Sequence, residues 1–395
     1  MHRALIMAGL LLAAAPSCGG PEKPVKTSKQ KDKQKQKDTR ALLSEARSSA
    51  AAGEIDSADK AYQQAFKTGK EFEILEERVD FLIHAGRATR AQEAAKAYYE
   101  ENSTDIKGYQ LYAEALLAGQ NGQEAFKVAE EIIGLNAEDP GGYEKKGRAL
   151  ILLDKPDEGF EALRKAVQLD SDNATYHVQL GLALYNAKKV NEAALAFRAA
   201  IKHAPDDAKA YVYLGMALRE QDELDESKER LDKALELDAN NGRAYFELGL
   251  LYNKQGKQAD AEQALSKAVQ KSPNESLFWY AYGEIYRLQE RFDDAISAYR
   301  KAIDLDPPHP KALTKLGLML VERKEYDEAE KILIGGVRRE PKNPANYLAL
   351  GELYVAKRKP KDAVFYYEKY LELAPRSDRE RARVKELLPG LKRRR

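Results

Sequence analysis

The feature that most constrains the fold is a dipeptide that returns every 34 residues. A glycine preceded by Leu or Tyr recurs at that interval as Gly181, Gly215, Gly249, Gly283, Gly317 and Gly351. A fixed period of this length indicates a stack of equal supersecondary units, because one unit is too small to bury its own apolar face. We therefore expect most of the 395 residues to form a single repeat array.

Other positions keep the same period and predict a pair of helices in each unit. Small residues stand twelve positions after the glycine, at Ala193, Ser227, Ala261, Ala295, Ala329 and Ala363. Within a unit, apolar residues recur at helical spacing in two stretches, such as Tyr211–Arg219 and Asp225–Leu237. Small residues let two helices approach closely, and a proline near the end of the unit stops the second helix.

This pattern resembles the tetratricopeptide repeat (TPR), and unit 276–309 carries it best, with Trp279, Gly283, Ala295, Tyr299 and Pro307. The resemblance implies an all-α fold, a right-handed superhelical solenoid of about ten helix-turn-helix repeats over 39–377. A capping helix and basic tail are expected at 378–395. The units are expected to start near residues 39, 72, 106, 140, 174, 208, 242, 276, 310 and 344.

The N-terminus has the order of an export signal. A positive start at Arg3 precedes the apolar run Ala4–Ala15, and small residues lead to Cys18, the only cysteine. Residues 1–17 resemble a bacterial lipoprotein signal peptide, although Ala15 and Pro16 depart from the usual lipobox. The resemblance implies lipidation of Cys18 and, with Gly19 following, an outer-membrane location facing the periplasm. The alternatives are an ordinary signal peptide or a structural thiol.

The formal charge is only +1, but both ends of the chain are basic. Residues 22–40 and 378–395 each hold eight bases and three acids, which leaves the body acidic. The overall balance argues against nucleic acid as a partner. We expect residues 18–38 to be a disordered Lys/Gln-rich tether, since lysine alternates with polar residues over Lys29–Lys37 and almost nothing is available for burial.

Catalytic and metal-binding patterns are missing from the sequence. It has no glycine-rich phosphate loop, no H-E-x-x-H and no G-x-S-x-G motif. The histidines are scattered; His177 and His203 share a unit but are placed on different helices, without ligand spacing. We therefore expect no enzyme activity, no cofactor and no metal.

The TPR resemblance implies a concave groove lined by the fifth, ninth and twelfth positions of each unit. In the central units these are Val178, Leu182, Tyr185, Val212, Met216, Arg219, Phe246, Leu250, Asn253, Tyr280, Glu284 and Arg287. The last two units add Thr314, Leu318, Val321, Leu348, Glu352 and Val355. So apolar a stripe favours binding; the alternative for any one residue is packing between repeats.

In the unit that starts at residue 140, Arg148 is expected to pair with Glu144, which lies four residues before it on the same helix.

Together these features predict a non-catalytic scaffold, anchored by lipid in the cell envelope, that binds protein or peptide partners to assemble or localise a complex. One alternative is a polyanion-binding protein that uses the basic runs Lys29–Lys37 and Lys392–Arg395. Another is a cytosolic TPR adaptor, if the N-terminal signal is not processed. A third, recruitment of a substrate to an enzyme on another chain, predicts the same groove.

Overall fold

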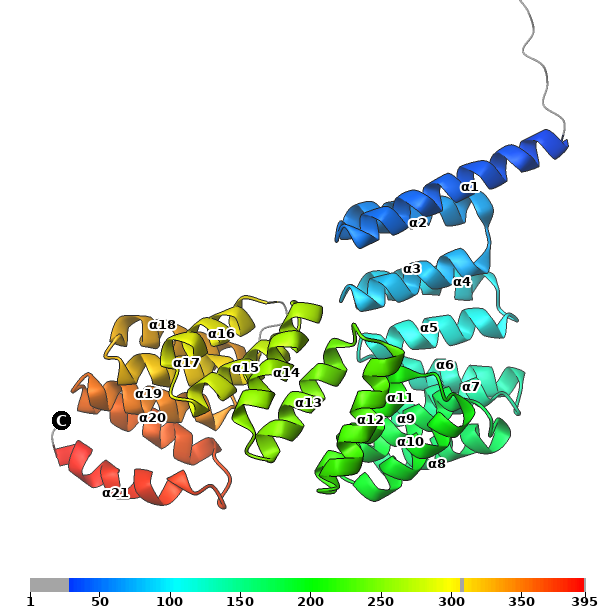
Figure 1. The fold of residues 1–395 in the computed structure, drawn as a ribbon. Helices are drawn as coiled ribbons and strands as arrows, with labels where there is room; N and C mark the ends of the chain where they lie inside the picture. The colour runs from blue at the N-terminus through cyan, green and yellow to red at the C-terminus, as the bar shows by residue number, and fades with distance from the viewer. Residues whose placement is uncertain (1–27, 306–308, 394–395) are drawn as a thin grey trace, which may run out of the picture. The chain divides into compact units, whose positions relative to one another are not determined.

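The computed structural model describes residues 28–305 and 309–393, and every regular element within them is a helix. The chain divides after Leu135 into two compact units. Six helices, blue to cyan-green in Figure 1, make up the first unit: α1 (Ser28–Ala51), α2 (Ile55–Gly69), α3 (Phe72–His84), α4 (Ala88–Glu101), α5 (Ile106–Ala118) and α6 (Gly122–Leu135).

The second unit continues the same arrangement in its described residues. Its helices are α7 (Pro140–Leu152), α8 (Pro156–Leu169), α9 (Ala174–Asn186), α10 (Val190–His203), α11 (Ala208–Glu220), α12 (Leu224–Leu237), α13 (Gly242–Lys254), α14 (Gln258–Lys271), α15 (Ser276–Leu288), α16 (Phe292–Asp304), α17 (Pro310–Glu322), α18 (Tyr326–Arg339), α19 (Pro344–Ala356), α20 (Pro360–Leu373) and α21 (Glu380–Arg393). Each odd-numbered helix up to α19 packs on the helix that follows it, and α21 packs on α20. The prediction of an all-α fold of stacked helix pairs is confirmed.

The first helix of nine pairs begins where the sequence analysis starts a unit, at residues 72, 106, 140, 174, 208, 242, 276, 310 and 344. Capping explains most of these starts. A side-chain oxygen just before the helix accepts a hydrogen bond from a free backbone amide of the first turn. The capping residues are Asp105, Asp139, Asn173, Asp207, Asn241 and Asn343.

The first helix differs from the prediction of a disordered tether over 18–38. Residues 28–38 form the start of α1, which extends beyond the end of α2 in Figure 1. Side chains 32–38 are exposed, and burial begins at Thr39. Lysine and glutamine favour helix, and residues 28–51 contain no glycine or proline, so the packed part nucleates a helix that continues outward. Residues 1–27, which include Cys18, lie outside the described residues.

The recurring glycine stands at the closest approach of the two helices of a pair. A Cβ atom on Gly215 would lie 2.7 Å from Leu231 Cγ, and one on Gly181 would lie 2.5 Å from the ring of Phe197. At the next close contact, buried Ser227 donates a hydrogen bond of 2.7 Å to the carbonyl oxygen of Gly215. The small residues therefore have the packing role that their period predicts.

The bulky residue at the fourth position of a unit has a second role besides packing. Its polar ring atom bonds the backbone carbonyl six residues earlier, in the turn that precedes the helix. Trp279 donates to Pro273 at 2.8 Å, and Tyr347 donates to Pro341 at the same distance. The ring nitrogen Nε2 of His177 lies 2.8 Å from the carbonyl of Ser171. Tyr109 and Tyr143 make the same bond, so in five repeats it ties the first helix to the turn before it.

The turn inside each helix pair places one residue in the left-handed backbone region. The φ angles of these residues range from +56° to +77°. Glycine, which adopts this region without strain, holds the position at Gly53, Gly86 and Gly256. The other pairs use Gln120, Asp154, Lys188, Asp222, Glu290, Lys324 and Arg358. Backbone strain is therefore repeated along the array.

Helix α21 covers the exposed side of the last pair. Val384 and Leu388 are buried on it, in one cluster with Tyr367 and Tyr370 of α20, while Leu387 remains partly exposed. Among the helices of the described residues, none combines the length and the apolar character needed to span a bilayer.

Candidate functional site

The central part of the predicted groove is more buried than the sequence implies. Val212, Met216 and Phe246 expose only 2%, 6% and 3% of their surface. Phe246 of α13 stacks on Phe278 of α15, with ring centroids 4.6 Å apart. The prediction that these three residues line an exposed groove is wrong. Val212 and Phe246 hold the fifth position of their repeats and Met216 holds the ninth, and in these two repeats the three side chains belong to the core.

The remaining central positions are intermediate or polar. Leu182 and Tyr185 pack against one core cluster, Leu250 against a second and Tyr280 against a third, while Val178 is half-buried. Asn253 is exposed. The other three positions are charged, and Arg219, Glu284 and Arg287 all take part in ion pairs.

A pocket of about 560 Å³ lies where the groove positions of the last two repeats meet α21. Five of the six groove positions expected in those repeats line it, from α17 and α19: Thr314, Leu318, Val321, Leu348 and Glu352. Helix α21 adds Glu380 and Arg383 to the lining. The aliphatic side chains are only partly buried, so they remain accessible to a ligand.

Charged groups surround this C-terminal pocket. Arg383 of α21 bonds Glu352 of α19, and this bond holds the capping helix beside the groove helix. Arg383 also lies 2.6 Å from Glu380 on its own helix. Lys315 lies 3.6 Å from Glu284 of α15. Glu322 is exposed on the wall formed by α17. The pocket thus combines an apolar surface with a rim of both charges, and glutamates predominate among its charged lining residues.

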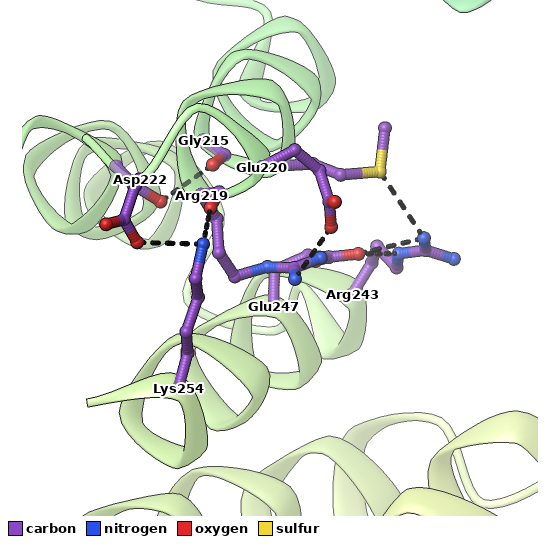
Figure 2. Close-up of polar contacts among 9 residues, drawn as sticks. Gly215, Arg219, Glu220, Asp222, Arg243, Glu247 and Lys254 are labelled. Atoms are coloured by element: carbon purple, nitrogen blue, oxygen red, sulfur yellow. Dashed lines mark hydrogen bonds and ion pairs between the residues drawn. The ribbon is translucent and has the colours of Figure 1, made fainter. Parts of the chain in front are cut away.

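A buried carboxylate stands further along the same set of first helices. Glu247 on α13 exposes 1% of its side chain and receives two arginines, Arg219 of α11 at 3.1 Å and Arg243 at 2.8 Å. Figure 2 shows the guanidinium groups meeting this one carboxylate from both sides. Lys254 closes the cluster by donating to the carbonyl oxygen of Arg219 at 2.7 Å. Sequence reasoning placed Arg219 in the groove but missed Glu247, which lies one position after the groove position held by Phe246.

Glu284 is a second carboxylate held by its neighbours. Burial would raise the pKa of Glu284, but hydrogen bonds from Tyr299 and Arg287 outweigh that effect and lower it. The pKa of the Tyr299 hydroxyl is raised in turn, first by burial and then by its bond to Glu284.

In the first repeat of the second unit, Arg148 lies 2.9 Å from Glu144, the same-helix pair that was predicted.

Two histidines that are distant in sequence are brought together. The rings of His177 and His203 stack with centroids 5.5 Å apart and planes 4° from parallel. The in-plane nitrogen lone pairs of two parallel rings do not converge on one point, and the residues that the structure describes include no cluster of three or more metal-ligating side chains. The sequence positions could have predicted this contact. His177 is near the start of α9 and His203 is at the end of α10, and these two ends lie side by side in a helical hairpin.

Of the two basic ends, only parts are described. Lys33, Lys35 and Lys37 are exposed on α1. At the other end, Lys392 forms an ion pair of 2.7 Å with Glu368 of α20. Part of the C-terminal charge is therefore already compensated within the fold.

Three family models match the sequence, and each is described as a tetratricopeptide repeat. One matches residues 144–208, 178–227 and 214–276, a second matches 286–350, and a third matches 344–377. Together these matches cover more than half of the chain. A comparison with curated proteins found no match.

Solved structures of the same architecture are similar over most of the chain. Yeast Tom70 superposes with a TM-score of 0.55 and 17% identity, over 91% of this chain and 96% of that one. The human IFIT1 dimer with PPP-AAAA gives 0.50 and 18%, over 88% and 95%. The Cut9–Hcn1 hetero-tetramer of the APC/C gives 0.51 and 14%, over 89% and 76%. At these identities the likeness shows the fold alone.

Proposed function

The chain belongs to the tetratricopeptide repeat family, and on that basis we propose that it is a non-catalytic scaffold that grips a peptide segment of a partner protein. The C-terminal pocket carries this proposal. Its walls include positions that line the ligand groove in the family, and here Leu318, Val321 and Leu348 are apolar and accessible, whereas Val212, Met216 and Phe246 are core residues. Its volume of about 560 Å³ lies in the usual range for ligand sites, roughly 300–1,000 Å³.

The chemistry of the pocket supports a peptide as the ligand. Leu318, Val321 and Leu348 offer apolar contact, which supplies affinity by removing surface from water. Glu322 and Glu352 stand at the same pocket, and polar groups at such a site orient a ligand and set its specificity. A partner segment with an aliphatic side chain next to a basic residue would match both the apolar wall and the glutamates of the pocket.

A pair of substitutions in the pocket tests the proposal. Val321→Glu with Leu348→Glu places two charges on the apolar wall, at side chains that are only partly buried. Photo-crosslinking in the native host through an unnatural residue at position 318 reports partner capture. We expect capture to be lost in this double variant and retained in Val355→Glu, which changes a groove position outside the pocket. Circular dichroism verifies that helix content is unchanged, and undiminished capture in the double variant contradicts the proposal.

We further propose that the scaffold is exported and held at the outer membrane, facing the periplasm, by lipid on Cys18. The support is the order of charge, apolar run, small residues and cysteine in residues 1–18. Two or more acyl chains anchor a protein stably, whereas one does so only marginally. Anchoring would fix the repeat array beside envelope proteins and restrict its choice of partners.

Intact mass and membrane fractionation test the anchor separately from the pocket. We expect the native-host product to start at Cys18, to carry acyl chains and to sediment with membranes. The Cys18→Ser variant is expected to lose both the added mass and the membrane association. An unmodified chain with an intact N-terminus would exclude the anchor and favour a cytosolic adaptor that uses the same pocket.

A further inference from the structure

A second cavity lies on helices that the peptide groove does not use. It has a volume of about 800 Å³ and opens between α2 and α4, the second helices of the first two pairs. Its base includes Leu75 of α3 together with Phe66 and Tyr98, whose rings meet edge to face with centroids 6.3 Å apart. All of its residues belong to the first compact unit.

The cavity lies where two second helices lack a link that occurs at three places in the second unit. At each of these places an arginine in the middle of one second helix bonds a glutamate on the next. Arg164 of α8 lies 2.9 Å from Glu192 of α10, and Arg300 of α16 lies 2.8 Å from Glu328 of α18. Between α2 and α4 the ion pairs gather at one end, where Arg90 binds Asp56 and Asp59.

Beyond Arg90 the two walls carry opposite charges that do not meet. The α2 wall presents Lys60 and Lys67, with Lys70 directly after the helix, and the α4 wall presents Glu93 and Glu101. All five side chains are exposed, and in the described first unit no hydrogen bond or ion pair joins these lysines to the glutamates. One wall is therefore basic and the other acidic, with an aromatic floor between them.

The shape of the walls favours a helix as the occupant. Short turns join α2, α3 and α4, so α2 and α4 run in the same direction with a trough between them. The small residues Ala94 and Ala97 lie on the α4 side, and small side chains permit the axial separation of about 8–10 Å at which helices pack. From Lys60 to Lys70 the trough is about 15 Å long, nearly three helical turns.

We propose that this α2–α4 trough binds an amphipathic helix of a partner protein, with an acidic flank over the lysines, a basic flank over the glutamates and an apolar face on Phe66 and Tyr98. Such a helix would supply partners for the lysines and glutamates, as the arginine–glutamate links do between α8, α10 and α12 and between α16 and α18. The trough is separate from the C-terminal pocket, so the scaffold would hold two partners, or two parts of one partner, at once.

Three synthetic helices of about 14 residues, four turns, test this arrangement. They share one apolar face of Leu and Ala and a fluorescein label. One carries Glu on one flank and Lys on the other, a second carries Glu on both flanks, and a third carries Lys on both. Fluorescence anisotropy with the full chain is expected to rank the mixed helix tightest, by about tenfold, because each uniform helix faces one wall of like charge.

Reversing one wall at a time gives the decisive comparison. Lys67→Glu with Lys70→Glu makes both walls acidic and should shift the preference to the helix with Lys on both flanks. Glu93→Lys with Glu101→Lys makes both walls basic and should shift it to the helix with Glu on both flanks. Lys202→Glu with Lys331→Glu is the matched control, since it changes the same charge on exposed helix surface elsewhere, and it should leave the ranking unchanged.

A filled trough separates this proposal from its alternatives. Ala97 is exposed in the trough, so the large side chain of Ala97→Trp would fill the space that the partner helix needs. This variant should abolish binding of the mixed helix, and circular dichroism verifies the fold. Binding that survives Ala97→Trp, equal affinity of the unmodified chain for the mixed and all-Glu helices, or no binding of any helix overturns the proposal. Self-association that disappears in Ala97→Trp, measured by sedimentation velocity, would identify a second copy as the occupant and also overturn it.

Discussion

The imidazole of His309 stacks on the phenol ring of Tyr280, with centroids 4.0 Å apart and planes 17° from parallel. His309 precedes α17 and Tyr280 lies on α15, so the contact links two consecutive repeats. Burial, with a smaller contribution from Lys311, lowers the pKa of His309 to about 4. The folded chain therefore favours the neutral imidazole at this position.

This stack predicts a loss of stability in mild acid. In the unfolded chain His309 is protonated near its ordinary pKa of about 6.5, whereas in the folded chain it is protonated only near pH 4. The contribution of His309 is thus fully present above pH 6.5 and declines as the pH falls toward 4. Urea unfolding of the unmodified chain and of His309→Phe at pH 7.5 and 5.0 measures this. The variant should lose less stability between the two values; equal losses would rule out this histidine as the cause.

The strained turns offer stabilising substitutions. Lys324 has a φ of +64°, and the left-handed region costs a residue with a Cβ about 1–2 kcal/mol. Lys324→Gly removes that cost but adds entropy to the unfolded chain, so we expect the free energy of unfolding to rise by about 0.5–1 kcal/mol. Gly256→Ala is the reverse change at the same turn position, with open space around the added methyl group, and should destabilise. Chemical denaturation that finds the same sign for both variants would contradict this reading.

Two glycines inside helices should respond oppositely to alanine. At Gly215 the new Cβ would lie 2.7 Å from Leu231 Cγ, and such overpacking typically costs about 1–3 kcal/mol. At Gly335 no atom lies within 4 Å of the new Cβ, so the better helix propensity of alanine should add about 0.5–1 kcal/mol. Thermal and urea denaturation of Gly215→Ala and Gly335→Ala compare them directly. A stabilised Gly215→Ala would mean that the helix pairs relax at their closest contact.

The buried carboxylate of Glu247 should matter far more than its exposed neighbour. Glu247→Ala leaves Arg219, whose side chain is only 14% exposed, without its main partner, and we expect a loss of about 3 kcal/mol. Glu220 also bonds Arg219, at 3.0 Å, but it is exposed, so Glu220→Ala should cost less than about 1 kcal/mol. Urea denaturation of the two alanine variants provides the comparison. Similar losses would mean that burial does not set the strength of this cluster.

The links between second helices should each be weak. Arg198 of α10 lies 3.1 Å from Glu226 of α12, and both side chains are partly exposed. A double-mutant cycle with Arg198→Met and Glu226→Gln should give a coupling free energy of about 0.5 kcal/mol. The coupling should decrease in about 1 M salt, where screening is strong. A coupling that salt leaves unchanged would indicate packing by the arginine stem instead.

The repeat frame was readable because it depends on local sequence. Aspartate, asparagine and proline set most starts of the first helices, and glycine and alanine mark the close contacts within each pair, so the predicted starts agree with the odd-numbered helices from α3 to α19. The left-handed backbone of the turn residue could not be predicted from the sequence, because lysine, glutamate and arginine occupy this position as well as glycine. The fate of Ser28–Asp38 also depended on context, since these residues extend a helix that is stabilised by packing further along.

By itself the sequence determined the all-α architecture, the starts of the first helices from residue 72 onward and the family, since these follow from a period that each unit repeats. Only the tertiary structure decided which groove positions remain open. Phe246 and Leu348 occupy the same position of their repeats, yet Phe246 is sealed by Phe278 of the next first helix, whereas Leu348 lines a pocket beside the capping helix. Exposure depends on the neighbour that packs against a residue, and no single repeat encodes that neighbour.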